Sequence, residues 1–221
     1  MKTALLILLV TLTTAFKMVQ QKNHVVFFGD SITEAGVAPG GYITVLKDLL
    51  NAKGRGESYL LTGAGISGNK VYDLYLRMDD DVMAKHPNTV VIWVGVNDVW
   101  HKKSFGTGTD ADKFEKFYTA IIKKLQAQKI RVILCTPAAI GEKTDFSNEL
   151  DGDLNKYSGI IRNLAKTYQC DLVDLRKQFL EYNRQNNPEN KDRNILTTDG
   201  VHLNSKGHQF VAEEMLKVIT L

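Results

Sequence analysis

The chain has 221 residues and a formal net charge of +3, with 43% hydrophobic and 24% charged residues. These values are typical of a globular protein, and one α/β domain commonly has this length. Because the net charge is small and no long block of lysine and arginine occurs, we expect no nucleic-acid partner.

Residues 1–20 have the composition of a signal peptide. Lys2 is followed by an apolar and hydroxylic stretch over residues 3–16, with small residues near its end. This pattern is typical of secretory leaders, so we predict a secreted or periplasmic protein. The stretch is too short to span a bilayer comfortably. An additional strand or core helix is the alternative. Residues 21–221 contain no repeat or linker and are expected to form a single domain.

Five short apolar runs predict β-strands buried on both faces. They cover residues 25–28, 59–62, 89–94, 130–136 and 171–174. Apolar residues at helical spacing predict six helices, at residues 42–53, 71–85, 110–128, 152–168, 176–186 and 205–219. We expect Thr109 to cap the third of these helices. The alternation of strands and helices indicates a parallel sheet covered by helices on both faces.

Three segments between these elements are expected to be loops that decide the substrate. They are residues 100–108, 141–150 and 187–198.

Small or polar residues follow the first three predicted strands. Ser31 closes a Gly-Asp-Ser triplet after the first strand, Gly68 follows the second, and Asn97 follows the third. Asp199 and His202 stand just before the last predicted helix. In an open α/β sheet the carboxyl ends of the strands lie at one edge, where ligands bind. We therefore expect these residues to meet there.

Together these groups supply what acyl transfer needs. Ser31 offers a hydroxyl nucleophile, and His202 is the natural general base. Asp199 precedes His202 by three residues, so a tight turn can bring its carboxylate to the imidazole ring. The main-chain N–H groups of Ser31 and Gly68 and the side-chain amide of Asn97 can hold the oxyanion. Taken alone, Ser31 could instead be a helix cap, and Asp199 with His202 could cap the last helix.

The same segments resemble the four signature blocks of the SGNH (GDSL) hydrolase family. The blocks are Gly29-Asp30-Ser31, the glycine of Ile66-Ser67-Gly68, Gly95-x-Asn97-Asp98 and Asp199-x-x-His202. The resemblance implies a three-layer α/β/α, flavodoxin-like fold with five parallel strands in the order 2-1-3-4-5. It also implies a serine esterase or acylhydrolase with a Ser-His-Asp triad and no metal or organic cofactor.

The segments between the blocks match the family only in general plan, and the substrate is decided there. The expected substrate is a small-molecule or carbohydrate ester with a short, acetyl-type acyl group. A lysophospholipase-like or thioesterase-like acylhydrolase of lipids, an O-acyltransferase and a non-catalytic binding module remain alternatives.

Four further residues close to the blocks have predicted roles. Asp30 is expected to support Ser31 through hydrogen bonds, and Asp98 to be a loop residue. Trp100 and His101 follow the third block and are candidates for the lining of the pocket.

Cys135 and Cys170 are expected to be free thiols. Their offset along neighbouring parallel strands separates them by roughly 15 Å, whereas a disulfide needs Cα atoms within about 7 Å.

Overall fold

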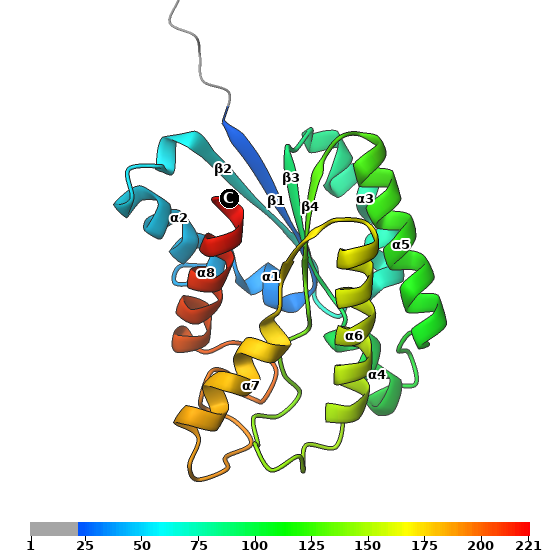
Figure 1. Ribbon diagram of the computed structural model, residues 1–221, viewed down its shortest axis with the longest axis vertical. Coiled ribbons are helices and arrows are strands. Elements are labelled where there is room, and N and C mark those ends of the chain that lie inside the picture. The colour runs from blue at the N-terminus through cyan, green and yellow to red at the C-terminus, as the bar shows by residue number, and fades with distance from the viewer. Residues whose placement is uncertain (1–21) are drawn as a thin grey trace, which may run out of the picture.

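The computed structural model describes residues 22–221 and contains one five-stranded sheet (Figure 1). All neighbouring strands are parallel, and their order is β2-β1-β3-β4-β5, which confirms the predicted order. The strands are β1 (Asn23–Gly29), β2 (Tyr59–Gly65), β3 (Thr89–Trp93), β4 (Arg131–Cys135) and β5 (Asp171–Val173). The last residue of β1, Gly29, pairs with Gly65 of β2 and Trp93 of β3, so three strands end at one level.

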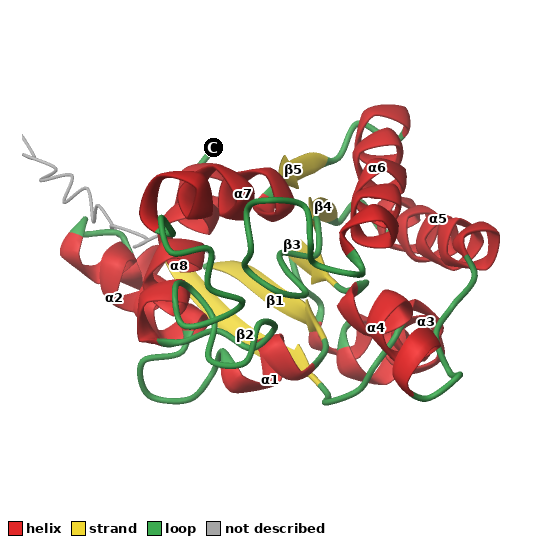
Figure 2. Cartoon of the chain, turned by 90° about the horizontal axis from the view of Figure 1, so that it is seen from below, coloured by secondary structure: helices red, strands yellow, loops and turns green. Residues whose placement is uncertain are grey.

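Helices cover both faces of the sheet. They are α1 (Ser31–Ala35), α2 (Tyr42–Ala52), α3 (Val71–Asp81), α4 (Val96–Ser104), α5 (Ala111–Ala127), α6 (Asp151–Thr167), α7 (Leu175–Asn186) and α8 (Ser205–Ile219). Two short 3-10 turns, η1 (Gly56–Ser58) and η2 (Met83–Lys85), precede β2 and β3. Seen from below in Figure 2, α1, α4 and the long loops lie over the end of the sheet.

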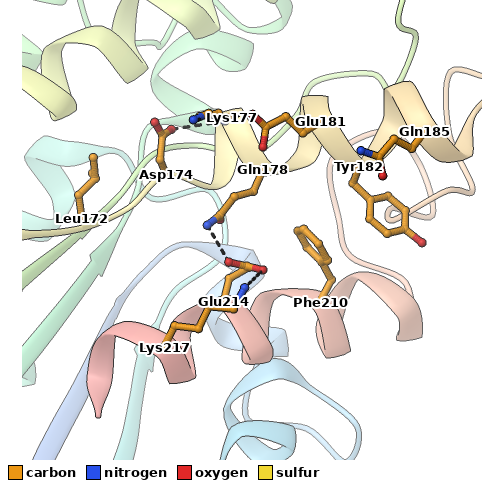
Figure 3. Close-up of a pocket in the computed structure, with 10 residues that line it drawn as sticks. All are labelled: Leu172, Asp174, Lys177, Gln178, Glu181, Tyr182, Gln185, Phe210, Glu214 and Lys217. Carbon is orange, nitrogen blue, oxygen red and sulfur yellow. Dashed lines mark hydrogen bonds and ion pairs between the residues drawn. The ribbon is translucent and has the colours of Figure 1, made fainter. Parts of the chain in front are cut away.

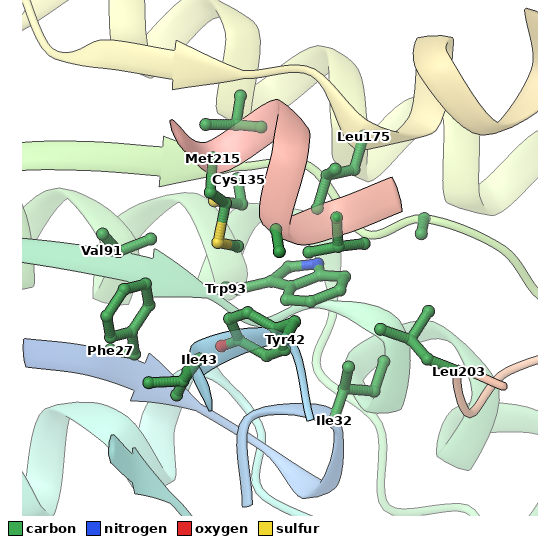
Figure 4. Packing of buried hydrophobic residues seen from close by; sticks show 14 of the residues in the cluster. Phe27, Ile32, Tyr42, Ile43, Val91, Trp93, Cys135, Leu175, Leu203 and Met215 are labelled. Carbon is green, nitrogen blue, oxygen red and sulfur yellow. The ribbon is translucent and has the colours of Figure 1, made fainter. Parts of the chain in front are cut away.

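Alternate residues of each central strand enter two separate cores, which is why the strands read as unbroken apolar runs. Phe27 and Val91 pack with α2, α7 and α8 on one face, as Figure 4 shows around Tyr42, Trp93 and Met215. Phe28 and Ile92 pack with α3, α5 and α6 on the other face. Phe27, Phe28 and Ile92 are completely buried.

The structure corrects the predicted ends of one strand and one helix. β2 continues through Gly65 instead of stopping at residue 62, because α1 packs directly on it. A Cβ atom at Gly65 would lie 2.1 Å from the main-chain nitrogen of Glu34. The helix predicted over residues 71–85 ends at Asp81, and a 3-10 turn takes the remaining residues.

The segment after β3 is a helix where a loop was predicted. Gly95 has a φ of 131°, a value that favours glycine, and it turns the chain from β3 directly into α4. α4 ends at Ser104, so the predicted loop over residues 100–108 is helical in its first half. The residue that caps α5 is Asp110 and not Thr109 as predicted.

The predicted leader, residues 1–20, lies outside the described residues. Among the helices of residues 22–221, none has the length and apolar character needed to cross a membrane.

Candidate active site

Ser31 is the first residue of α1 and stands directly after the end of β1. Gly29 permits the sharp turn between them, because a Cβ atom there would lie 2.3 Å from the Thr33 hydroxyl and 2.5 Å from the Trp93 carbonyl. The cap of α1 is Asp30, whose carboxylate accepts the N–H of Ile32 at 3.0 Å. The alternative in which Ser31 serves as the cap is therefore wrong, and its hydroxyl is free for another partner.

That partner is His202, 171 residues further along the chain. The Ser31 hydroxyl lies 3.0 Å from His202 Nε2. The other ring nitrogen, His202 Nδ1, lies 2.7 Å from Asp199 Oδ2. The second oxygen of Asp199 accepts the N–H groups of Val201 and His202 at 2.9 and 2.7 Å. The structure thus brings the three predicted residues into one continuous hydrogen-bonded chain.

The environment of Asp199 keeps its carboxylate ionised. Burial raises the pKa of this carboxyl, but the hydrogen bonds from His202 and Val201 outweigh burial and lower it below the ordinary value. The residue that caps α8 is Asn204, whose side chain accepts the Gly207 N–H at 2.9 Å. The alternative in which Asp199 and His202 cap α8 is therefore wrong.

Gly68 and Asn97 lie in adjacent segments. Gly68 has a φ of 75° in the loop after β2, a conformation that favours glycine. Asn97 is buried at the start of α4, and its amide donates to the Asn69 carbonyl at 3.1 Å. The Asn97 side chain is thereby held next to the Gly68 loop, where the sequence predicts a second oxyanion donor.

Two basic residues hold the Gly68 loop, and sequence reasoning missed both. Lys70 is 7% exposed, and its ammonium donates to the Gly68 carbonyl at 3.0 Å. Arg77 donates to the carbonyls of Gly29 and Ala64 and, at 2.7 Å, to the side chain of Asn69. Arg77 therefore ties the ends of β1 and β2 to this loop. Their acceptors are mostly main-chain carbonyls, which leave no pattern in a sequence.

Asp30 and Asp98 are two buried carboxyl groups beside the site. Burial, together with the nearby Asp98 charge, raises the pKa of Asp30 to about 7. Asp98 lies in α4 and is completely buried, so its assignment to a loop was wrong. Asp30 supports Ser31 as predicted, through the cap that begins α1.

Trp100 lies beside the catalytic histidine candidate. Its ring centroid is 6.4 Å from that of His202, in an edge-on arrangement. Trp100 also lines a hollow of about 370 Å³ together with Ile140 and Leu150, and with the polar side chains of Lys103, Ser104 and Glu149. Trp100 thus lines a pocket, as predicted. The neighbouring His101 faces the Gly68 loop, since a Cβ atom at Gly68 would lie 3.9 Å from its ring.

A second groove, of about 550 Å³, lies between α7 and α8 (Figure 3). Tyr182 and Phe210 are in its wall, but none of the five predicted site residues lines it. Within residues 22–221, no group of three or more His, Cys, Asp or Glu side chains is arranged to hold a metal ion. Cys135 and Cys170 are free thiols, as predicted.

Comparison with known proteins gives the same family as the four motifs. The model of the GDSL-like Lipase/Acylhydrolase family matches residues 27–210. A crystal structure of an acetyl xylan esterase, AlAXEase, is 66% identical, covers 89% of this chain and 99% of its own, and superposes with a TM-score of 0.88. The acetylxylan esterase of Geobacillus stearothermophilus is 28% identical over 89% of this chain and 94% of its own length. The isoamyl acetate-hydrolyzing esterase of Schizosaccharomyces pombe is 24% identical over 90% of this chain and 75% of its own length. This chain therefore belongs to the GDSL-like lipase/acylhydrolase family and is a carboxylic ester hydrolase.

Proposed function

We propose that the enzyme removes acetyl groups from acetylated xylan or its oligosaccharides, with Ser31 as the nucleophile. The observation that carries this proposal is the hydrogen-bonded chain from the Ser31 hydroxyl through His202 to Asp199. The acetyl group and the xylan are supported by the two acetyl xylan esterases that this chain resembles, one of them at 66% identity.

The first half of the reaction forms an acetyl-enzyme. Ser31 Oγ attacks the acetyl carbonyl carbon while His202 Nε2 accepts the hydroxyl proton. Asp199 holds the ring by Nδ1 and stabilises the imidazolium that forms. His202 then gives the proton to the sugar oxygen, the bond from that oxygen to the carbonyl carbon breaks, and the deacetylated sugar leaves.

The second half releases acetate. Water attacks the acetyl carbonyl while His202 accepts its proton, and the same proton then returns to Ser31 Oγ. In both halves the oxyanion is held by the N–H groups of Ser31 and Gly68 and by the Asn97 amide. Each such donor is worth about 3 kcal/mol of barrier.

The hollow lined by Trp100 is suited to the sugar. Trp100, which lines it, lies beside His202. An aromatic ring offers an apolar surface to a sugar ring, and Lys103, Ser104 and Glu149 offer hydrogen-bonding groups to its hydroxyls.

The decisive experiment is an acetate-release assay on acetylated xylo-oligosaccharides, run beside chromogenic esters of increasing acyl length. We expect acetate release, a preference for acetyl over longer acyl groups, and loss of both activities in Ser31→Ala. Ser58→Ala, at the opposite end of the sheet, is the matched control and keeps full activity. Faster hydrolysis of long-chain esters than of acetyl esters would favour a lipid acylhydrolase instead. Transfer of acetyl to an added sugar in preference to water would favour a transferase.

We also propose that residues 1–20 direct export, as their composition indicates. An enzyme that acts on polymeric xylan has to meet its substrate outside the cytoplasm. N-terminal sequencing of the protein recovered from the periplasm or medium tests this, and recovery of the intact N-terminus from the cytoplasm alone would refute it.

A further inference from the structure

Glu142 is a buried carboxylate that the reaction above does not use. It lies in the loop between β4 and α6 and is 1% exposed. Its Oε2 accepts the N–H of Ile195 at 2.8 Å, and its Oε1 accepts those of Leu196 and Thr197 at 2.7 and 3.1 Å. No Lys or Arg side chain within residues 22–221 forms an ion pair with it. Three successive main-chain N–H groups therefore satisfy this charge.

The main chain around Glu142 is itself fixed to the same region. Glu142 N donates to the Asp192 carbonyl at 3.0 Å, and Gly141 N donates to the Gly200 carbonyl at 2.9 Å. The Asn187 side chain donates to the Glu142 carbonyl at 2.9 Å. The main chain at Glu142 is thus hydrogen-bonded to the same region that its carboxylate holds.

The segment that Glu142 holds is the base of the loop that carries Asp199 and His202. Thr197 forms an antiparallel bridge with Leu203, and Thr198 N donates to the His202 carbonyl at 2.8 Å. The Thr197 hydroxyl accepts the N–H of Gly200 at 3.0 Å. A shift of Thr197 therefore moves both ends of the short turn that contains the acid and the base.

The opposite side of this segment is held by Asn204. Its side chain donates to the carbonyls of Ile195 and Thr197, and its main-chain nitrogen donates to the Leu196 carbonyl at 3.0 Å. The main-chain N–H groups of residues 195–197 are thus paired with Glu142, and the carbonyls of the same residues are paired with Asn204. Among the described residues, Glu142 is the only side chain that accepts from these three N–H groups.

We propose that Glu142 is a positioning residue for the catalytic pair, which sets the place of the Asp199–His202 turn relative to Ser31. The inference rests on the proposed function, because it assigns a role to the same triad. A carboxylate suits this place since its two oxygens accept all three N–H groups. An amide has one oxygen, so in Glu142→Gln the NH₂ group would face the N–H of Ile195 and one donor would be left unpaired.

The test must separate positioning from stability, because loss of a buried hydrogen bond also destabilises the fold. Glu142→Gln is compared with Leu125→Ala. Leu125 is a buried residue of α5, and its carbonyl accepts the N–H of Ile130 just before β4, so the alanine variant leaves a cavity in the core. For each enzyme the thermal midpoint, kcat and KM for a soluble acetyl ester, and the rate of labelling by a fluorophosphonate are measured at a temperature where all are folded.

We expect Glu142→Gln to lower kcat and the labelling rate at least tenfold while KM changes less than twofold. Leu125→Ala loses thermal stability to a similar or greater extent but keeps its kcat, KM and labelling rate.

A lower thermal midpoint in Glu142→Gln with wild-type kcat and labelling rate would overturn the proposal and leave Glu142 a structural residue. If Glu142→Gln does not fold, Glu142→Asp replaces it, since the charge is kept on a shorter side chain. At least a threefold loss of kcat is then expected, and a wild-type kcat would overturn the proposal. Failure of the proposed function is seen separately, as acetate release that survives Ser31→Ala.

Discussion

Both carboxylate oxygens of Asp98 face the main-chain N–H of Val71, at 3.2 and 3.3 Å, although the two residues are 27 positions apart. This contact joins the first residue of α3 to the first turn of α4. Gly68 lies shortly before Val71, and Asn97 is the neighbour of Asp98. The contact therefore fixes, relative to each other, the two segments that carry the proposed second and third oxyanion donors.

Because Asp98 is buried, the titration of its carboxyl makes the stability of the protein depend on pH. Burial raises the pKa of Asp98 to about 7, against about 3.9 in an unfolded chain. The folded state thus binds the proton more tightly, so the stabilisation is complete below the unfolded pKa and is lost as pH rises through 7. In Asp98→Asn this dependence is absent. From about pH 5 to about pH 8.5 we expect the wild type to lose on the order of 2 kcal/mol relative to Asp98→Asn.

Urea unfolding of both proteins at the two pH values measures this difference. Asp30 remains in both proteins, but without the Asp98 charge its pKa is raised less, and this adds to the difference in the same direction. A difference in unfolding free energy between the two proteins that is the same at both pH values would contradict the prediction.

The second prediction concerns the acid of the triad. Asn at position 199 places an amide against His202 Nδ1, where the carboxylate now fixes the tautomer and stabilises the imidazolium. In a triad of this kind the change lowers kcat by about 10⁴-fold. We expect Asp199→Asn to show this loss near neutral pH with little change in KM, in steady-state assays on an acetyl ester. A loss below tenfold would mean that His202 is oriented by other contacts.

The third prediction concerns the oxyanion. Removing one such donor costs about 10²–10³-fold in kcat. Asn97→Ala is expected to lose this much in kcat, with KM nearly unchanged, because the amide acts on the charge of the transition state. The variant also loses the hydrogen bond to the Asn69 carbonyl, so its thermal midpoint is measured beside the kinetics. An unchanged kcat would remove Asn97 from the oxyanion site.

Much of this architecture could be predicted from two patterns that are local in the sequence: apolar runs for the strands and helical spacing of apolar residues for the helices. Central strands buried on both faces appear as unbroken apolar runs, and α8 was placed at its observed bounds by its helical spacing. α1 and α4 were missed because short helices at the strand ends contain too few turns for a periodic signal. The four motifs indicate Ser31, Asp199 and His202 because the proposed reaction uses their side chains, and side chains can be read from the sequence.

The residues that hold those groups in place could not be predicted. Lys70 and Arg77 donate largely to main-chain carbonyls, and Glu142 accepts from main-chain N–H groups that lie 53 to 55 residues away. Any residue can supply a main-chain partner, so no side-chain pattern marks such contacts. They become visible only when the distances are known.

The last prediction uses two helical glycines that have opposite surroundings. Gly159 lies in α6, and a Cβ atom there would meet no heavy atom within 4 Å. Gly207 lies in α8, where a Cβ atom would fall 2.0 Å from the Leu196 carbonyl oxygen. Gly159→Ala is expected to stabilise the protein by about 0.5–1 kcal/mol, since alanine loses less backbone entropy on folding.

Gly207→Ala gains the same entropy but must displace the Leu196 carbonyl, and overpacking of this kind costs about 1–3 kcal/mol. Because Leu196 is also held by Glu142, the displacement reaches the turn that carries His202, and kcat falls with stability. Denaturant unfolding and acetyl-ester kinetics on the two variants test both halves. Equal changes in stability and kcat for the two substitutions would show that the Leu196 segment moves aside at no cost in free energy. That result would also weaken the role assigned to Glu142.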